Sequence, residues 1–228
     1  MRTVDLAVTP LRDLNQALHD LAADPQAEPW KIVNPRGRHA IACGIDAPVT
    51  VEIDGHVGYY CAGMNKKATV LVNGNAGTGV AENMMSGVVH VKGDASQSAG
   101  ATGCGGLLII DGKTSARCGI SLKGLDIIVR GSVGHMSGFM AQAGRIVVLG
   151  DAGEALGDSI YEAEIFVRGA VKSLGADCVE KPLDDEAAAG LADLLARSGM
   201  DDVKPQDFRR YGSARELYHF KPHNVGAY

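Results

Sequence analysis

The chain has 228 residues, 46% of them hydrophobic and 21% charged, with a net charge of −5, which is enough apolar material for one domain with a sizeable core. The mixed charge argues against a nucleic-acid partner, and the absence of a long apolar run or of a basic start followed by an apolar stretch predicts neither a membrane span nor a secretory signal. We therefore expect a soluble, cytoplasmic protein with no membrane and no nucleic acid as partner.

Residues 1–35 predict an N-terminal arm made of a short strand and a helix. The stretch "TVDLAV" alternates between apolar and polar residues, as a strand does. Thr9 then predicts the N-cap, and Pro10 the first residue, of a helix over "LRDLNQALHDLA". Leucines three or four residues apart place one apolar face on this helix.

Residues 36–180 contain a repeat of nineteen residues. Seven strand-like segments each end on a glycine, and these anchor glycines are Gly55, Gly74, Gly93, Gly112, Gly131, Gly150 and Gly169. The residues two and four positions before each anchor are Val or Ile in thirteen of fourteen cases, the pattern of a strand with one buried face. Seven uninterrupted copies predict stacked coils, and nineteen residues are too few for a strand plus a helix in each copy. We therefore predict an all-β parallel β-helix of about seven coils.

Small residues also recur three and seven positions after each anchor, as expected where a coil turns sharply against its neighbour. The corner glycines at these positions include Gly134, Gly138, Gly153 and Gly157, whereas Ser96, Ser115 and Lys172 depart from the pattern. The stretch "GDAGEALG" (150–157) could by itself be a phosphate-binding loop. A phosphate loop has no reason to be copied in register, so we interpret it as a coil corner.

Residues 181–228 predict a C-terminal helical tail that caps the solenoid or docks onto a partner. The stretch "LDDEAAAGLADLLARSG" predicts a helix from near Asp184 to Gly199, and "PQDFRRYGSARELYHF" predicts a second, more aromatic element. An open solenoid end exposes an unpaired strand and needs a cover.

Two sets of residues are candidates for a partner interface. The first is an outward apolar stripe three positions before the anchors, formed by Leu71, Ile109, Ile128, Val147 and Phe166. Either the chain's own tail or a partner must bury it, and the sequence leaves both open. The second set joins arginines to aromatic residues in the tail, which are favoured interface anchors; it comprises Arg209, Arg210, Tyr211, Arg215, Tyr218 and Phe220.

The repeat columns offer no reactive set of side chains. The five cysteines contain no C-x-x-C pair, and Cys61 and Cys118 share one column three coils apart, too far to bond or to share a metal. His56, His90 and His135 occupy three different columns. We therefore expect no catalytic, cofactor-binding or metal-ligating residue in this chain.

Glycines at positions zero, three and seven of a coil resemble the G-x-x-G-x-x-x-G repeat of the GXGXG domain family, most clearly in "GSVGHMSG" (131–138) and "GDAGEALG". This family includes the C-terminal domain of the glutamate synthase large subunit, so the resemblance implies a right-handed β-helix. The chain's size, "GDSIYEAEIFVRGAVKSLGADC" (157–178) and "RRYGSARELYHF" make it most similar to the free-standing GXGXG subunit of the N-methylglutamate synthase family.

That resemblance implies a non-catalytic scaffold. It would bridge a glutamine-amidotransferase-type subunit and a subunit that carries FMN and an iron–sulfur cluster, in a complex that makes N-methylglutamate and ammonia from glutamate and methylamine.

Two other functions remain open. The same fold also serves as the β-helical subunit of formylmethanofuran dehydrogenase or of the formyltransferase/hydrolase complex. An independent β-helix enzyme or ligand-binding protein would instead be expected to carry a row of charged residues on one outer strand face, where this chain has an apolar stripe.

Overall fold

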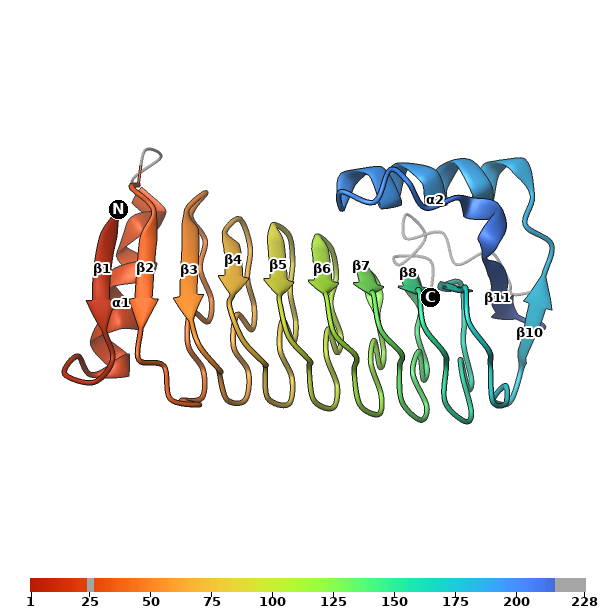
Figure 1. The fold of residues 1–228 in the computed structure, drawn as a ribbon, viewed down its shortest axis with the longest axis horizontal. Coiled ribbons are helices and arrows are strands. Elements are labelled where there is room, and N and C mark those ends of the chain that lie inside the picture. The colour runs from red at the N-terminus through yellow and green to blue at the C-terminus, as the bar shows by residue number, and fades with distance from the viewer. Residues whose placement is uncertain (24–26, 216–228) are drawn as a thin grey trace, which may run out of the picture.

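The computed structural model describes residues 1–23 and 27–215 and shows one long sheet with helices near its two ends (Figure 1). The strands run in the order β1-β2-β3-β4-β5-β6-β7-β8-β9-β11-β10. The elements are β1 (Arg2–Asp5), α1 (Leu11–Asp20), η1 (Leu21–Ala23), β2 (Trp30–Val33), β3 (Thr50–Asp54), β4 (Thr69–Val72), β5 (Val88–Val91), β6 (Leu107–Ile110), β7 (Lys123–Val129), β8 (Ala143–Val148), β9 (Glu164–Val167), β10 (Cys178–Lys181), α2 (Asp185–Arg197), η2 (Pro205–Asp207) and β11 (Arg209–Ser213).

Strands β3 to β9 pair in parallel with the register that the repeat predicts. Val51 lies opposite Val70, and Val70 opposite Val89. The same register continues to the last coil, where Ile146 lies opposite Ile165. The prediction of an all-β parallel β-helix with about seven coils is confirmed.

The inward side chains of these strands fill the interior of the solenoid. The residues two and four positions before each anchor are all 0% exposed. Burying each such side chain contributes about 1.5–3 kcal/mol, and Val and Ile fit the pleated surface on which equivalent residues stack from coil to coil. They are Val51, Ile53, Val70, Val72, Val89, Val91, Leu108, Ile110, Ile127, Val129, Ile146, Val148, Ile165 and Val167.

The corner glycines meet two separate needs. A Cβ atom on Gly74 would lie 2.6 Å from the carbonyl carbon and oxygen of Gly55, so the anchor position needs glycine because backbone touches backbone. Seven positions after an anchor the backbone is left-handed instead: Gly119 has φ +67, and its Cβ would lie 2.5 Å from Cδ1 of Ile146. Gly150, in "GDAGEALG", behaves as an anchor, because its Cβ would lie 2.7 Å from the backbone of the preceding coil. That stretch is therefore a coil corner.

The N-terminal arm contains the expected strand and helix, and it also lengthens the ladder. Pro10 is the N-cap of α1 rather than its first residue, and Leu14 and Leu18 form the buried face. Strand β2 was not predicted; it places Trp30 opposite Val51 and pairs on its other side with β1. The parallel ladder therefore begins before residue 36.

The C-terminal segment contains one helix of the expected extent and one strand in place of the second expected element. Asp184 is the N-cap of α2 and accepts a hydrogen bond from the Ala187 N–H, and Gly199 follows the helix with φ +72. Residues 209–213 of the later stretch form a strand and are not part of a helical tail, because β11 inserts antiparallel between β9 and β10. Insertion there gives the last solenoid strand a hydrogen-bonded neighbour. No helix within residues 1–23 or 27–215 is long and apolar enough to cross a membrane.

Candidate docking surfaces

Helix α2 and the chain that returns from it cover the C-terminal part of the outward apolar stripe. Ile128, Val147 and Phe166 are 0% exposed, and Ile109 is 5% exposed. These four form one buried cluster with residues of the tail, which are Ala187, Leu191, Leu194, Leu195, Met200 and Phe208. The leucines of α2 are spaced for one helical face, so the chain itself buries this part of the stripe. These four residues are therefore not a free surface for a partner. Their assignment to a partner interface is corrected, because the chain's own tail is their cover.

A paired arginine fastens α2 to the sheet beside this cluster. The Arg145 guanidinium donates to both carboxylate oxygens of Asp126, from Nε at 2.8 Å and from Nη2 at 2.6 Å. Its third nitrogen, Nη1, donates to the Gly190 carbonyl on α2 at 2.8 Å. The hydrogen bonds to Asp126 raise the pKa of Arg145 above its ordinary value. Two-point pairing of this kind fixes orientation as well as charge, so it sets the position of the helix on the sheet.

The predicted interface residues at the start of the tail lie in β11 and contact the solenoid. Arg209 donates to the Gly169 carbonyl at 2.7 Å, and Arg210 Nε donates to Glu164 Oε1 at 2.7 Å. Tyr211 is 2% exposed. Within the described structure, these three residues close the end of the solenoid.

Of the three remaining interface candidates in the tail, one lies within the described residues and two lie beyond them. The Arg215 guanidinium pairs with the Asp177 carboxylate, next to the last coil. Tyr218 and Phe220 lie outside the described residues. No structural role is therefore assigned to these two aromatic side chains.

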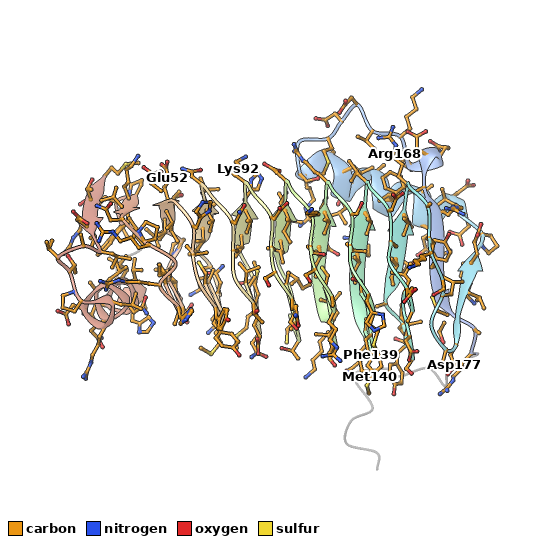
Figure 2. All side chains as sticks on the ribbon, turned by 60° about the horizontal axis from the view of Figure 1, so that its bottom comes forward. Glu52, Lys92, Phe139, Met140, Arg168 and Asp177 are labelled. Carbon is orange, nitrogen blue, oxygen red and sulfur yellow. The ribbon has the colours of Figure 1, made fainter. Side chains whose placement is uncertain are left out.

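Strands β2 to β4 expose a largely polar outer face that contributes no residue to the cluster under α2. Lys31 Nζ lies 2.8 Å from an Asp54 carboxylate oxygen, and Asn73 donates to Asp54 and to Glu52 at 2.9 and 2.8 Å. Leu71, the fifth residue of the predicted stripe, is partly buried and lies opposite Glu52 in the ladder. Figure 2 shows Glu52 on the same side of the solenoid as Lys92, opposite Phe139 and Met140. This half of the outer face therefore carries a ladder of ion pairs and hydrogen bonds.

The buried thiols are unsuited to nucleophilic chemistry. Cys61 and Cys118 are both 0% exposed. Burial raises the pKa of Cys118 to about 12 and raises the pKa of Cys61 as well. The thiolate is the reactive form of cysteine, so a raised pKa leaves these two thiols unreactive. Both are buried core residues, as their shared column predicts.

The three histidines singled out in the repeat lie apart. His90 contacts Asp111 at 2.9 Å on the outer face, His135 is exposed, and His56 Nδ1 accepts a hydrogen bond from the Asn75 N–H at 2.9 Å. Among the residues that the structure describes, no group of three or more His, Cys, Asp or Glu side chains could hold a metal ion.

One exposed group of residues was missed by the sequence reasoning. The connections from β2 to β3 and from β3 to β4 together expose Arg36, Arg38, His39, Tyr59 and Tyr60. The adjacent tyrosines of "GYYC" were the available signal, because none of the next five coils carries an aromatic pair at these two repeat positions.

No protein-family model matches the chain. Protein GlxC of Rhizobium meliloti (strain 1021) is 59% identical to it over 228 residues, which is the full length of both proteins. The chain therefore belongs to the family of protein GlxC.

Proposed function

We propose that this protein is a non-catalytic scaffold subunit of a glutamate-synthase-like complex of the N-methylglutamate synthase type. In this complex it bridges a glutamine-amidotransferase-type subunit and a subunit with FMN and an iron–sulfur cluster. The complex converts glutamate and methylamine to N-methylglutamate and ammonia.

The observation that carries the proposal is that the repeated glycines form the contacts between neighbouring coils. The G-x-x-G-x-x-x-G pattern, by which the chain resembles the GXGXG domain, contributes coil contacts here: Gly131 and Gly150 are anchors with no room for a Cβ, and Gly138 has φ +74 at the left-handed corner. These glycines therefore have a structural role in the coil, and such a role supports the proposed scaffold. It builds a rigid rod with stacked, repeating surfaces, a suitable form for holding two proteins in a fixed relation.

The bound groups of the complex are assigned to the other subunits. An iron–sulfur cluster needs several thiolates at one place, whereas Cys61 and Cys118 share one column three coils apart, about 14 Å at a spacing of about 4.8 Å per coil, with raised thiol pKa values. Cys61 and Cys118 therefore cannot both bind one cluster, and the described residues contain no group of three or more His, Cys, Asp or Glu side chains that could hold a metal ion. In this proposal the chain contributes position and contact to the complex.

Co-expression tests the proposal. The chain is produced with an amidotransferase-type and a flavin-type subunit from the same source, and the products are separated by size exclusion with absorbance recorded at flavin wavelengths. We expect one species that contains all three proteins and forms N-methylglutamate from glutamate and methylamine. Elution of the chain apart from both proteins, or N-methylglutamate formation by the chain alone, would contradict the proposal. A three-protein species that makes only glutamate would retain the scaffold and overturn the proposed reaction.

A further inference from the structure

The first two connections of the solenoid expose more aromatic surface than the fold requires. Tyr59 is 51% and Tyr60 48% exposed, in a chain with only six tyrosines. Tyr60 has φ +58 at a left-handed corner, a conformation that costs a bulky residue about 1–2 kcal/mol. Gly79 and Ser98 occupy the same position in the next two coils. The solenoid therefore does not need an aromatic ring there.

The ring of Tyr59 and the backbone of Tyr60 are held in place before any partner binds. The Tyr59 ring stacks on His39, with ring centroids 4.4 Å apart and an angle of 19° between the planes. The Tyr60 carbonyl accepts hydrogen bonds from Cys43 Sγ at 2.7 Å and from the Gly63 N–H at 3.2 Å. Fixed aromatic side chains lose little conformational entropy when they are buried by a partner.

The polar groups around the tyrosines are mainly hydrogen-bond donors. His39 Nδ1 accepts from the Tyr59 N–H at 2.8 Å, and His56 Nδ1 accepts from the Asn75 N–H at 2.9 Å. With Nδ1 engaged as an acceptor, each neutral ring carries its proton on Nε2 and can donate from there. Arg38 adds a guanidinium, which only donates.

The region also contains two exposed cationic side chains. Arg36 and Arg38 are both exposed, and neither forms an ion pair within 4.0 Å in the described part of the chain. Asp5 lies close enough to Arg36 for the two charges to interact, and hydrogen bonds from Asn34 and Ala7 lower the pKa of this carboxyl. Glu82 lies beside Tyr60 but is partly buried. Two exposed guanidiniums thus stand out in a chain whose net charge is −5.

We propose that Arg36, Arg38, His39, His56, Tyr59 and Tyr60, here called the Arg/Tyr patch, dock onto a carboxylate-rich surface of one of the other two subunits. This inference rests on the proposed function and names the part of the scaffold that makes one of its contacts. The patch lies on the loops that join β2 to β3 and β3 to β4, at the N-terminal end of the rod (Figure 1). Tyrosine and arginine are the residue types that most often dominate binding energy at interfaces, and complementary charge speeds and directs association.

Binding measurements with purified partner subunits test the patch. The probes are the amidotransferase-type and the flavin-type subunit, each titrated with the wild-type chain, Arg38→Glu, Tyr60→Ala and a matched control, Arg117→Glu. Arg117 is exposed and occupies the same repeat position as Tyr60, three coils further along. We expect Arg38→Glu and Tyr60→Ala each to weaken binding of one subunit about tenfold or more, with unchanged thermal stability for Arg38→Glu and unchanged binding for the control. Added salt should weaken wild-type binding more than that of Arg38→Glu.

The possible failures are distinguishable. If the wild-type chain binds neither subunit, the proposed function fails, and the docking inference fails with it. If both subunits bind all four chains equally, or if the control loses as much affinity as Arg38→Glu, the scaffold stands and the Arg/Tyr patch is overturned. Two further results would also overturn it: a dimer of the wild-type chain alone that Arg38→Glu dissociates, or tight binding of a single-stranded oligonucleotide that Arg38→Glu abolishes.

Discussion

A carboxylate placed under α2 tests whether the chain itself buries the apolar stripe. Val147 is 0% exposed, lies between Ile128 and Phe166 in the ladder, and belongs to the cluster formed with the α2 leucines. The change Val147→Asp removes about 1.5–3 kcal/mol of side-chain burial and leaves a polar group without a partner in an apolar site, which costs about 1–3 kcal/mol more. We therefore expect a loss of roughly 2.5–6 kcal/mol, a large part of the usual stability of about 5–15 kcal/mol.

Urea unfolding of the isolated chain, followed by circular dichroism, measures this loss. Leu71→Asp is the matched control, because Leu71 occupies the same column but lies beyond the cluster under α2 and is only partly buried; we expect it to cost about 1 kcal/mol or less. If Val147→Asp changed stability no more than Leu71→Asp does, α2 would not cover the stripe, and the stripe would be open to a partner.

Three further predictions follow from the corners, the α2 cap and the thiols. Gly131→Ala should destabilise the chain by about 1–3 kcal/mol in urea unfolding, because its Cβ would lie 2.7 Å from the oxygen of the preceding anchor. Ala81→Gly should stay within about 1 kcal/mol, because Ala81 already has φ +57; equal costs for the two variants would contradict the division of corner roles. A hydrogen bond from the Ala187 N–H, helped by Arg210, lowers the pKa of Asp184 from 3.8, so this carboxylate stabilises the fold at neutral pH and that contribution is lost as pH falls below its ordinary pKa. Asp184→Asn can still cap the helix and does not titrate, so its urea midpoint should fall less on acidification than that of wild type, and an identical pH profile would refute the assignment. Cys104 is exposed whereas Cys61 and Cys118 are buried, so a thiol reagent should label the native chain first at Cys104, and Cys104→Ser should remove that fast phase; its persistence would show that another thiol is accessible.

The sequence predicted the elements that depend on periodicity or on local capping. The nineteen-residue spacing of anchors such as Gly74 and Gly93 determines the strand register. Asp184 is the N-cap of α2 because its side chain accepts a hydrogen bond from a backbone N–H three residues later, and Gly199 ends the helix because it adopts a positive φ. Such features need no knowledge of distant contacts.

The missed elements depend on contacts between distant segments. Trp30 lies opposite Val51, outside the nineteen-residue spacing, so the repeat did not predict β2. Strand β11 is short and rich in arginine, and it is a strand because it lies between β9 and β10. The apolar column containing Ile128 required a cover, but its residues could not tell α2 from a partner.

The candidate docking residues also separate into features that the local sequence predicts and features that depend on contacts between distant segments. The tail residues Arg210 and Tyr211 have the composition of an interface, and the interface they form in the structure is with the solenoid itself. The Arg/Tyr patch escaped notice because its members come from two loops that stack only in the folded coil, where His39 meets Tyr59.

Native mass spectrometry of the three subunits tests the central claim most directly. The amidotransferase-type and flavin-type subunits are mixed first without and then with this chain. We predict that the two remain separate when alone and appear in one assembly, together with this chain, once it is added. Association of the two in its absence, with no change on addition of the chain, would contradict its role as the scaffold between them.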